Sequence, residues 1–314
     1  MEIADKEIYL SPGPTFPAPQ SPWTLSHEII LPLWKVWPSK NRFFLNGRIM
    51  IGPKEDQKYL LCTWALLASV SIFYFIFISP YLWITISPIL PIIAMYCFLS
   101  SMVFIWLTTT TEPGIIPKKP VWEVIGTVPE EFTEAVLISQ PNRGYKYCPT
   151  CKIYRPPRSH HCKNCGNCVE DFDHHCRFLD NCIGKRNYRW FMSSVFSSIS
   201  LGVTEITGFL FFLFYNVGED HSRRSLIEDG PTIICIVVII TLFSLIITVF
   251  VSILCIFHMT LCITGESTKE RIKGIKAESK RSCCRKKRSY FDRMMLLNSA
   301  QIRNIVDEYP PNSV

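Results

Sequence analysis

The stretch TIICIVVIITLFSLIITVFVSILCIFHMTLCI, residues 232–263, carries no Asp, Glu, Lys or Arg. About 20 predominantly apolar residues are enough to cross the hydrocarbon core of a bilayer as a helix, whereas buried helices of soluble proteins seldom run so far without a charge. Three more apolar stretches precede it, at 59–78, 89–110 and 191–215. The sequence therefore predicts a polytopic α-helical membrane protein with four transmembrane helices.

The distribution of Lys and Arg predicts the side of the membrane on which each connecting segment lies. These residues are abundant in the N-terminal arm 1–58, the loop 111–190 and the C-terminal tail 264–314, are absent from the turn 79–88, and are outnumbered by acids in the loop 216–231. Because cytosolic segments carry the excess of Lys and Arg, we expect the arm, the 111–190 loop and the tail in the cytosol. The 216–231 loop is expected in the lumen. The net charge of +7 is then expected to attract anionic lipid and not nucleic acid.

Seven of the 14 cysteines fall between residues 148 and 182. This segment is expected in the reducing cytosol, where disulfides are rare, and repeated Cys-x-x-Cys with nearby His is the spacing of zinc ligands. A closed structural zinc site takes four such ligands, so two sites need eight. The segment offers eleven: Cys148, Cys151, His160, His161, Cys162, Cys165, Cys168, His174, His175, Cys176 and Cys182.

If six Cys and two His fill two sites, one cysteine is left over, and Cys176 is the best candidate. It lies outside the Cys-x-x-Cys units and follows His174 and His175 directly. In an extended segment, alternate residues share a face, so His174 and Cys176 would face one way and His175 the other, toward a metal. A His beside a Cys can generate a thiolate nucleophile. Asp173 could orient His174 if a local turn directs the Asp173 carboxylate toward the His174 ring. The alternative is that Cys176 is a redundant ligand or an inert thiol.

The segment CPTCKIYRPPRSHHCKNCGNCVEDFDHHCRFLDNCIGKRNYRWF, residues 148–191, resembles the cysteine-rich domain of the DHHC protein S-acyltransferases, or palmitoyltransferases. It contains the Cys-Pro-x-Cys, Arg-Pro-Pro-Arg-Ser-His-His-Cys, Asp-His-His-Cys, Asn-Cys-Ile-Gly and Asn-Tyr-Arg elements at the spacing of that family. Four spans with this domain, 146–191, between the second and third also resemble the family architecture.

The resemblance implies two structural zinc ions held by interleaved ligands. The first set is Cys148, Cys151, His161 and Cys168, and the second is Cys162, Cys165, His175 and Cys182. Closed sites of this kind hold a loop in shape and do not activate water.

The resemblance also implies an activity, that of a protein-cysteine S-palmitoyltransferase. Such an enzyme moves a long-chain acyl group from acyl-CoA to cysteines of membrane-associated proteins through an acyl-Cys176 intermediate, with His174 as base and Asp173 as its partner. We expect a membrane of the secretory pathway (Golgi or ER) or the plasma membrane, with the active site facing the cytosol. The need for an accessory subunit is left open.

Two features near the third span bear on acyl-CoA binding. Its small residues would leave room for an acyl chain, although they also suit close helix packing. Three cations before the span could meet the CoA phosphates, although a positive flank is common beside any span. The small residues are Ser193, Ser194, Ser197, Ser198, Ser200 and Gly202, and the cations are Lys185, Arg186 and Arg189.

The chain departs from the family pattern in a few places. Arg177 and Phe178 stand where the family has Pro-Trp, and we expect the Arg177 charge to lower the pKa of the neighbouring thiol. Glu112 replaces an Asp after the second span, and Ser267 replaces the first Thr of Thr-Thr-x-Glu after the fourth, where its hydroxyl could still bond to Asp173. The alternative to an enzyme is therefore a catalytically weak or inactive DHHC-like membrane zinc scaffold or adaptor.

Two other classes fit less well. A RING-type ubiquitin ligase would need a further Cys-x-x-Cys pair after Cys182, and a zinc transporter would need ligands inside the spans, where Cys and His are scattered. The tail sequence CCRKKR, residues 283–288, is a candidate for self-acylation beside a basic cluster. The alternative is a solvated basic run with incidental thiols.

Overall fold

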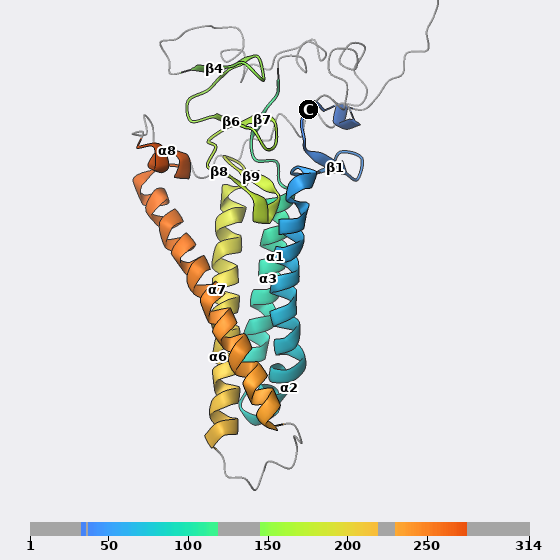
Figure 1. Ribbon diagram of the computed structural model, residues 1–314, viewed down its shortest axis with the longest axis vertical. Helices are drawn as coiled ribbons and strands as arrows, with labels where there is room; N and C mark the ends of the chain where they lie inside the picture. Colours follow the sequence, from blue (N-terminus) through green and yellow to red (C-terminus); the bar gives the residue numbers. More distant parts are fainter. Residues whose placement is uncertain (1–32, 36, 119–144, 219–229, 275–314) are drawn as a thin grey trace, which may run out of the picture.

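The computed structural model describes residues 33–35, 37–118, 145–218 and 230–274 of the chain. Long helices run side by side along the longest axis of the molecule, and the short strands gather at one end of them (Figure 1). The CCRKKR segment lies outside the described residues.

The four long helical segments confirm the predicted membrane architecture. Each is long and apolar enough to cross a bilayer, and together they cover Lys54–Thr85, Ile89–Thr110, Tyr188–Asn216 and Thr232–Thr264. The first segment is composite, and the other three are single helices. In chain order the elements are η2 (Lys54–Asp56), α1 (Gln57–Phe73), the π-helical η3 (Tyr74–Ile78), α2 (Ser79–Thr85), α3 (Ile89–Thr110), α6 (Tyr188–Gly218) and α7 (Gly230–Thr264).

The turn after the first span is shorter than the sequence suggested. Helix α2 takes up Ser79–Thr85, so that only residues 86–88 join it to α3. Pro80 does not break the helix because it lies in the first turn of α2, directly after the π-helical turn η3, where the regular i→i−4 hydrogen bonding is already interrupted. The π-helical turn before it lets the chain change register.

Helix α6 is the centre of the bundle and packs against α3, α7 and α2. Tyr74 and Phe209 are fully buried between the first span and α6, with their rings edge to face at 5.6 Å. Gly208 allows this approach, because a Cβ there would lie 2.5 Å from the ring of Tyr74.

Three small antiparallel sheets form the cysteine-rich end. The pairs are β4 (Lys146–Cys148) with β5 (Ile153–Arg155) and β8 (His174–Cys176) with β9 (Asn181–Ile183), and the third sheet has the order β3 (Ile115–Ile116), β7 (Asn167–Val169), β6 (His160–Cys162). Its core is built largely of buried cysteines. Strands of three residues do not hold together alone. This end therefore depends on interactions of its buried cysteines, which form no disulfides among the described residues.

Two asparagines attach this end to the bundle. The Asn181 amide donates to the main-chain carbonyls of Thr108, Thr109 and Thr111 at the end of α3, at 2.9–3.2 Å. The Asn187 amide donates to the carbonyl of Cys182 at 2.8 Å and, more weakly, to those of Thr108 and Thr111 at 3.4–3.5 Å. The last carbonyls of a helix have no intrahelical partner, so these amides satisfy them and hold β9 on α3.

The N-terminal arm is also attached to the cysteine-rich end. It forms a short 3₁₀ turn, η1 (Leu33–Lys35), and a hairpin of β1 (Arg42–Phe44) and β2 (Ile49–Ile51). The Arg42 guanidinium forms an ion pair with Asp180, and the Gly52 N–H donates to the Asp180 carbonyl at 2.6 Å. The hairpin is thereby tied to the turn between the 3₁₀ helix η5 (Arg177–Leu179), which follows Cys176, and β9.

Candidate active site and metal centres

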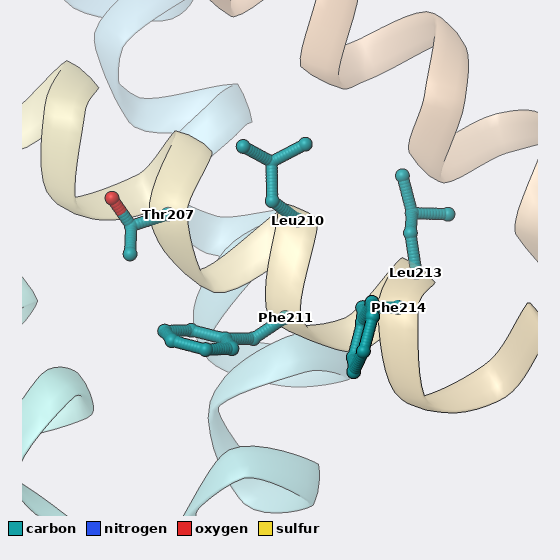
Figure 2. Close-up of a pocket in the computed structure, with 5 residues that line it drawn as sticks. All are labelled: Thr207, Leu210, Phe211, Leu213 and Phe214. Carbon is teal, nitrogen blue, oxygen red and sulfur yellow. The ribbon is translucent and has the colours of Figure 1, made fainter. Parts of the chain in front are cut away.

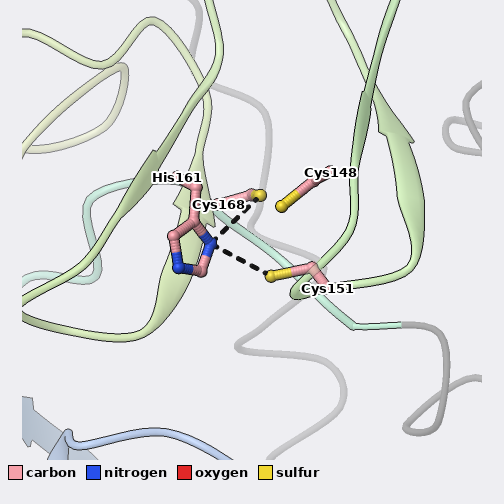
Figure 3. A group of neighbouring side chains, drawn as sticks. All are labelled: Cys148, Cys151, His161 and Cys168. Atoms are coloured by element: carbon pink, nitrogen blue, oxygen red, sulfur yellow. Dashed lines mark hydrogen bonds between the residues drawn. The ribbon is translucent and has the colours of Figure 1, made fainter.

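The first metal cluster joins the β4–β5 hairpin to the β6–β7 hairpin. His161 and Cys168 are directly opposite each other in the β6–β7 ladder, so their side chains share one face. Nδ1 of His161 lies 3.3 Å from Sγ of Cys151 and 3.7 Å from Sγ of Cys168, and Cys148 faces the same centre (Figure 3). Four donor atoms therefore converge within 4.8 Å.

The second cluster joins the turn after β6 to the β8–β9 hairpin. His175 and Cys182 are opposite each other in that ladder. Nδ1 of His175 lies 3.4–3.6 Å from the sulfurs of Cys162, Cys165 and Cys182. The structure thus brings together the same two sets of four side chains that the family resemblance implies.

The spacing of these donors suits zinc. Tetrahedral bonds of about 2.3 Å to sulfur and about 2.0 Å to nitrogen place neighbouring donors about 3.5–3.8 Å apart. The N-to-S separations of 3.3–3.7 Å match that edge length. The six cysteines are buried, and thiolates packed this closely would repel one another without a cation. Both clusters can therefore hold zinc ions.

Asp56 fixes the orientation of His175. Its Oδ2 accepts a hydrogen bond from Nε2 of His175 at 2.7 Å, which leaves Nδ1 free of hydrogen and directed at the three sulfurs. A carboxylate on the far nitrogen of a ligating histidine holds the ring and raises its basicity. Asp56 precedes α1 and is buried, so the first span begins at the second metal cluster.

The candidate catalytic residues lie on the opposite face of β8. Alternation along the strand places His174 and Cys176 away from the metal side occupied by His175. Nδ1 of His174 lies 2.8 Å from Oδ2 of Asp173, and Asp173 can turn toward it because it precedes the strand, after the left-handed residue Asp171 (φ 43°). Burial alone would lower the pKa of His174, but its hydrogen bonds to Asp173 and Cys176 outweigh burial and raise the pKa to about 9.

Thr268 holds Asp173 through two hydrogen bonds. The Thr268 hydroxyl donates to Oδ2 of Asp173 at 2.6 Å and its N–H donates to Oδ1 at 3.0 Å. The Ser267 hydroxyl instead caps the short helix α8 (Thr268–Lys273) by accepting from the N–H of Glu270. Residue 267 is the N-cap, where a side-chain oxygen turns back onto the helix.

An apolar cavity of about 470 Å³ opens beside Cys176 and extends between α1, α6 and α7. Three of the small residues of the third span line it, namely Ser194, Ser198 and Gly202. Gly202 also packs closely on α7, since a Cβ there would lie 2.2 Å from Oγ1 of Thr248. Far along α6, Glu205 lines the cavity and accepts a hydrogen bond of 2.6 Å from the Ser71 hydroxyl.

A second apolar recess lies elsewhere on α6. Its residues, Thr207, Leu210, Phe211, Leu213 and Phe214, all come from that one helix and project from its surface (Figure 2). Phe214 is 75% exposed. A recess on a single apolar helix face is what a lipid-facing surface presents, and it lies away from Cys176.

The three cations proposed for CoA phosphates do not converge on one point. Lys185 pairs with Glu170 at 2.5 Å, and Arg186 pairs with Glu112 at 2.9 Å. Arg189 lies over the ring of Trp190 at 4.2 Å. Arg186 is largely enclosed, whereas Lys185 and Arg189 are exposed.

Arg177 and Phe178 lie against the start of the first span. The Arg177 guanidinium lies 3.8 Å from Asp56 and 5.9 Å from the ring of Tyr59. Its charge is thus directed to a carboxylate and an aromatic ring. Phe178 packs edge-on to Tyr59 and lines the cavity, as expected of an aromatic wall.

Several residues around the site were not anticipated. Asp56 carries no local motif that would single it out as the partner of His175. Thr268 is the second Thr of the Thr-Thr-x-Glu pattern, but the pattern does not say that its hydroxyl reaches Asp173. Arg158, within the Arg-Pro-Pro-Arg element, pairs with Glu270 of α8 at 2.7 Å. Buried His258 of α7 lies against the His174 ring, at 5.7 Å between ring centres, and within 3.2 Å of the Tyr188 hydroxyl.

Comparison with known proteins gives a consistent result. Residues 141–275 match the family model described as DHHC palmitoyltransferase. Mouse palmitoyltransferase ZDHHC18 is 35% identical over 190 residues, which are 57% of this chain and 48% of the relative. Human palmitoyltransferase ZDHHC14 is 36% identical over 179 residues (52% and 36%), and zebrafish palmitoyltransferase ZDHHC18-B is 35% identical over 221 residues (66% and 55%). The chain spans about half the length of the curated relatives it matches.

Proposed function

Because residues 141–275 are a DHHC palmitoyltransferase domain, we propose that this protein is a protein S-acyltransferase, moving a long-chain acyl group such as palmitoyl from acyl-CoA to protein cysteines. One observation carries the proposal. Cys176 stands where the His174–Asp173 pair meets an apolar cavity between membrane-spanning helices. A nucleophile, a base and a slot for an acyl chain are thus within reach of one another.

The first step forms an acyl-enzyme. Cys176 gives up its proton to His174, and the thiolate attacks the carbonyl carbon of the acyl-CoA thioester. The bond from that carbon to the CoA sulfur breaks, and CoA leaves as a thiol after taking a proton from His174. Asp173 keeps the imidazole oriented and favours its protonated form.

The second step passes the acyl group on. A cysteine thiol of a membrane-associated protein loses its proton to His174 and attacks the acyl-Cys176 carbonyl. The bond to Cys176 breaks and the thiolate is regenerated. One thioester is exchanged for another in each step, so alignment of the sulfurs contributes most of the acceleration.

The two zinc ions, when bound, supply closed tetrahedral cross-links in this scheme, without chemistry of their own. The second cluster holds β8 on the face opposite Cys176. Asp56, at the start of the first span, is hydrogen-bonded to His175 of that cluster. The residues that would hold zinc therefore keep the loop of the nucleophile in shape.

We assign the CoA phosphates to the exposed Lys185 and Arg189, and a structural role to Arg186. Each of the two exposed cations is near the start of α6, the helix that lines the cavity. Replacing both by Ala should raise the KM for acyl-CoA with little change in kcat, because phosphate contacts distant from the thioester contribute uniform binding.

We place Cys176 on the cytosolic side, where Lys and Arg are concentrated. The host membrane would be one of the secretory pathway, Golgi or ER, or the plasma membrane. The acceptors would be membrane-associated proteins with cysteines near that surface.

The decisive experiment is acyl loading of the purified protein. Incubation with labelled palmitoyl-CoA should place hydroxylamine-sensitive label on Cys176, which mass spectrometry of the peptide can locate. Cys176→Ser should lose the label, and Cys235→Ser, an exposed cysteine in α7, should keep it. Label that persists in Cys176→Ser contradicts the proposal.

The same measurement tests the scaffold alternative. A protein that binds two zinc ions but takes up no acyl label, and passes none to a cysteine-containing peptide, would be a zinc-bearing membrane adaptor. The cavity beside Cys176 favours the enzyme, since an adaptor has no need of an acyl slot.

A further inference from the structure

The tip of the β1–β2 hairpin exposes two neighbouring apolar side chains. Phe44 is 49% exposed and Leu45 is 69% exposed. Among the described residues at the cysteine-rich end of the molecule, they are the only adjacent pair of large apolar residues that are both exposed. Contiguous exposed apolar surface, especially when rimmed by polar residues, is a feature of surfaces that contact a membrane or a protein.

The tip is held in an unfavourable backbone conformation. Leu45, Asn46 and Gly47 have φ values of 48°, 57° and 83°, and a leucine seldom adopts the left-handed region. Gly47 is required there because a Cβ would lie 2.7 Å from Cδ1 of Trp34. The Trp34 side chain is thus packed against the turn, and the turn presents Leu45 outward instead of burying it.

Three exposed cations lie close in sequence to the hairpin and to Trp34. Arg48 in the hairpin, Lys35 beside Trp34 and Lys54 at the start of the first span are all exposed. Lys35 lies over the ring of Trp34, with Nζ 5.5 Å from the ring centre. An apolar centre with a tryptophan and a basic rim is the composition that anionic bilayer surfaces attract.

The open end of the hairpin lies next to the start of the first span. Strand β2 ends at Ile51, and the first membrane span begins at Lys54. Residues of an extended chain advance by at most about 3.6 Å each, so the strand end is within about 11 Å of the span. The hairpin lies beside the upper end of α1, clear of the other helices (Figure 1).

We propose that the β1–β2 hairpin is an interfacial anchor, whose tip of Phe44 and Leu45, with Trp34, inserts among the headgroups of the membrane that the helices cross. Lys35, Arg48 and Lys54 bind anionic headgroups around it. The occupant of this surface is lipid and not a protein partner.

The anchor is connected to the loop that carries Cys176. Arg42 of the hairpin pairs with Asp180, and Gly52 donates to the Asp180 carbonyl. Asp180 closes the η5 turn directly after Cys176–Leu179, with φ at 46°. The depth of the hairpin in the headgroup layer therefore sets the height of this loop above the bilayer.

Photo-crosslinking of the full chain tests the anchor directly. The protein carries p-benzoylphenylalanine in place of Leu45, or of Phe44, in nanodiscs of phosphatidylcholine with or without phosphatidylserine. Tyr147 is the matched control, because it is 50% exposed but lies on β4, far from the spans. Ile84, 85% exposed within the first span, is the lipid-contacting reference.

We expect phospholipid adducts at positions 44 and 45 at about tenfold the yield at position 147, since apolar side chains at an interface enter the headgroup layer. Phosphatidylserine should raise the yield at position 45, and Arg48→Gln should remove that increase. Zinc content and acyl loading should match the unsubstituted protein, which shows that the labelled chains are folded.

Other outcomes overturn the anchor. Adducts to a second copy of the chain or to another protein would make the tip a protein-binding surface. Equal low yields at positions 45 and 147 would leave it in solvent. Neither result would contradict the acyl-transfer proposal, because that proposal is tested separately by the label on Cys176.

Discussion

At the scale of single residues, the adjacent His174 and His175 face opposite sides of β8 and serve different sites. His175 points at three sulfurs and Asp56, whereas His174 is bonded to Asp173. We expect His174→Ala to keep both zinc ions but to lower the rate of acyl loading by about 10²–10⁴-fold, the usual contribution of a general base. His175→Ala should lose zinc from the second cluster. Elemental analysis and labelling rates measure the two effects.

A conservative change separates ligation from folding at the same strand. His175→Cys keeps a donor that zinc accepts, so it should retain more zinc than His175→Ala. His174 is not a ligand, so His174→Cys and His174→Ala should have the same zinc content. Equal zinc loss in the two alanine variants would show that the faces of β8 are not divided in this way.

At the scale of elements, α8 clamps the catalytic strand from the far end of the chain. Its first residue, Thr268, bonds to buried Asp173, and its Glu270 pairs with Arg158. Thr268→Val removes one hydroxyl while keeping the shape of the side chain. Leaving a buried carboxylate with one bond fewer costs about 1–3 kcal/mol, so acyl loading should fall about tenfold or more.

The matched control is Thr260→Val in α7, where the exposed hydroxyl bonds only to the Phe257 carbonyl of its own helix. That variant should load acyl groups at the normal rate. Zinc content should be unchanged in both. A Thr268→Val protein with normal kinetics would mean that the backbone N–H bond of residue 268 suffices to hold Asp173.

The helix that lines the cavity should select the acyl chain by length. Ser198 faces the cavity, whereas Ser200 on the same helix is exposed and is not part of its lining. Ser198→Phe should fill the cavity and shift the preference toward shorter acyl-CoAs, and Ser200→Phe should not. Competition between acyl-CoAs of different length measures the preference. Identical profiles would place the acyl chain elsewhere.

At the scale of the whole molecule, the cysteine-rich end and the helical bundle should respond differently to loss of metal. The cysteine-rich end has strands of two or three residues and a core of cysteines, while the bundle packs through Tyr74, Phe209 and their neighbours. Two zinc ions per chain are expected from the two clusters. Binding of a structural zinc contributes about 10–16 kcal/mol in small domains.

A strong chelator should therefore abolish acyl loading and expose the cysteines to alkylation, while most of the helical circular dichroism remains. Readdition of zinc should restore loading. Loss of the helical signal in parallel with the metal would show that the bundle depends on the cysteine-rich end.

The sequence by itself determined the four spans, the cysteine-rich segment between the second and third, and the separation of Cys176 from the metal-ligand sets. These follow from local rules. Length and apolar composition predict a span. Cys-x-x-Cys spacing predicts a metal site, and the alternation of side chains along a strand predicts the two faces of β8. The small residues of the third span left a cavity and close helix packing equally open, and both occur along α6.

Only the tertiary structure decided which distant residues complete the site. Asp56 meets His175 across 119 positions, and Thr268 meets Asp173 across 95. Such contacts depend on how α1 and α7 pack at the cysteine-rich end, and uniformly apolar helices carry no periodic pattern that specifies their facing sides. For the same reason the sequence did not show that Arg186 pairs with Glu112, that Ser267 caps α8, or that the N-terminal hairpin docks on Asp180.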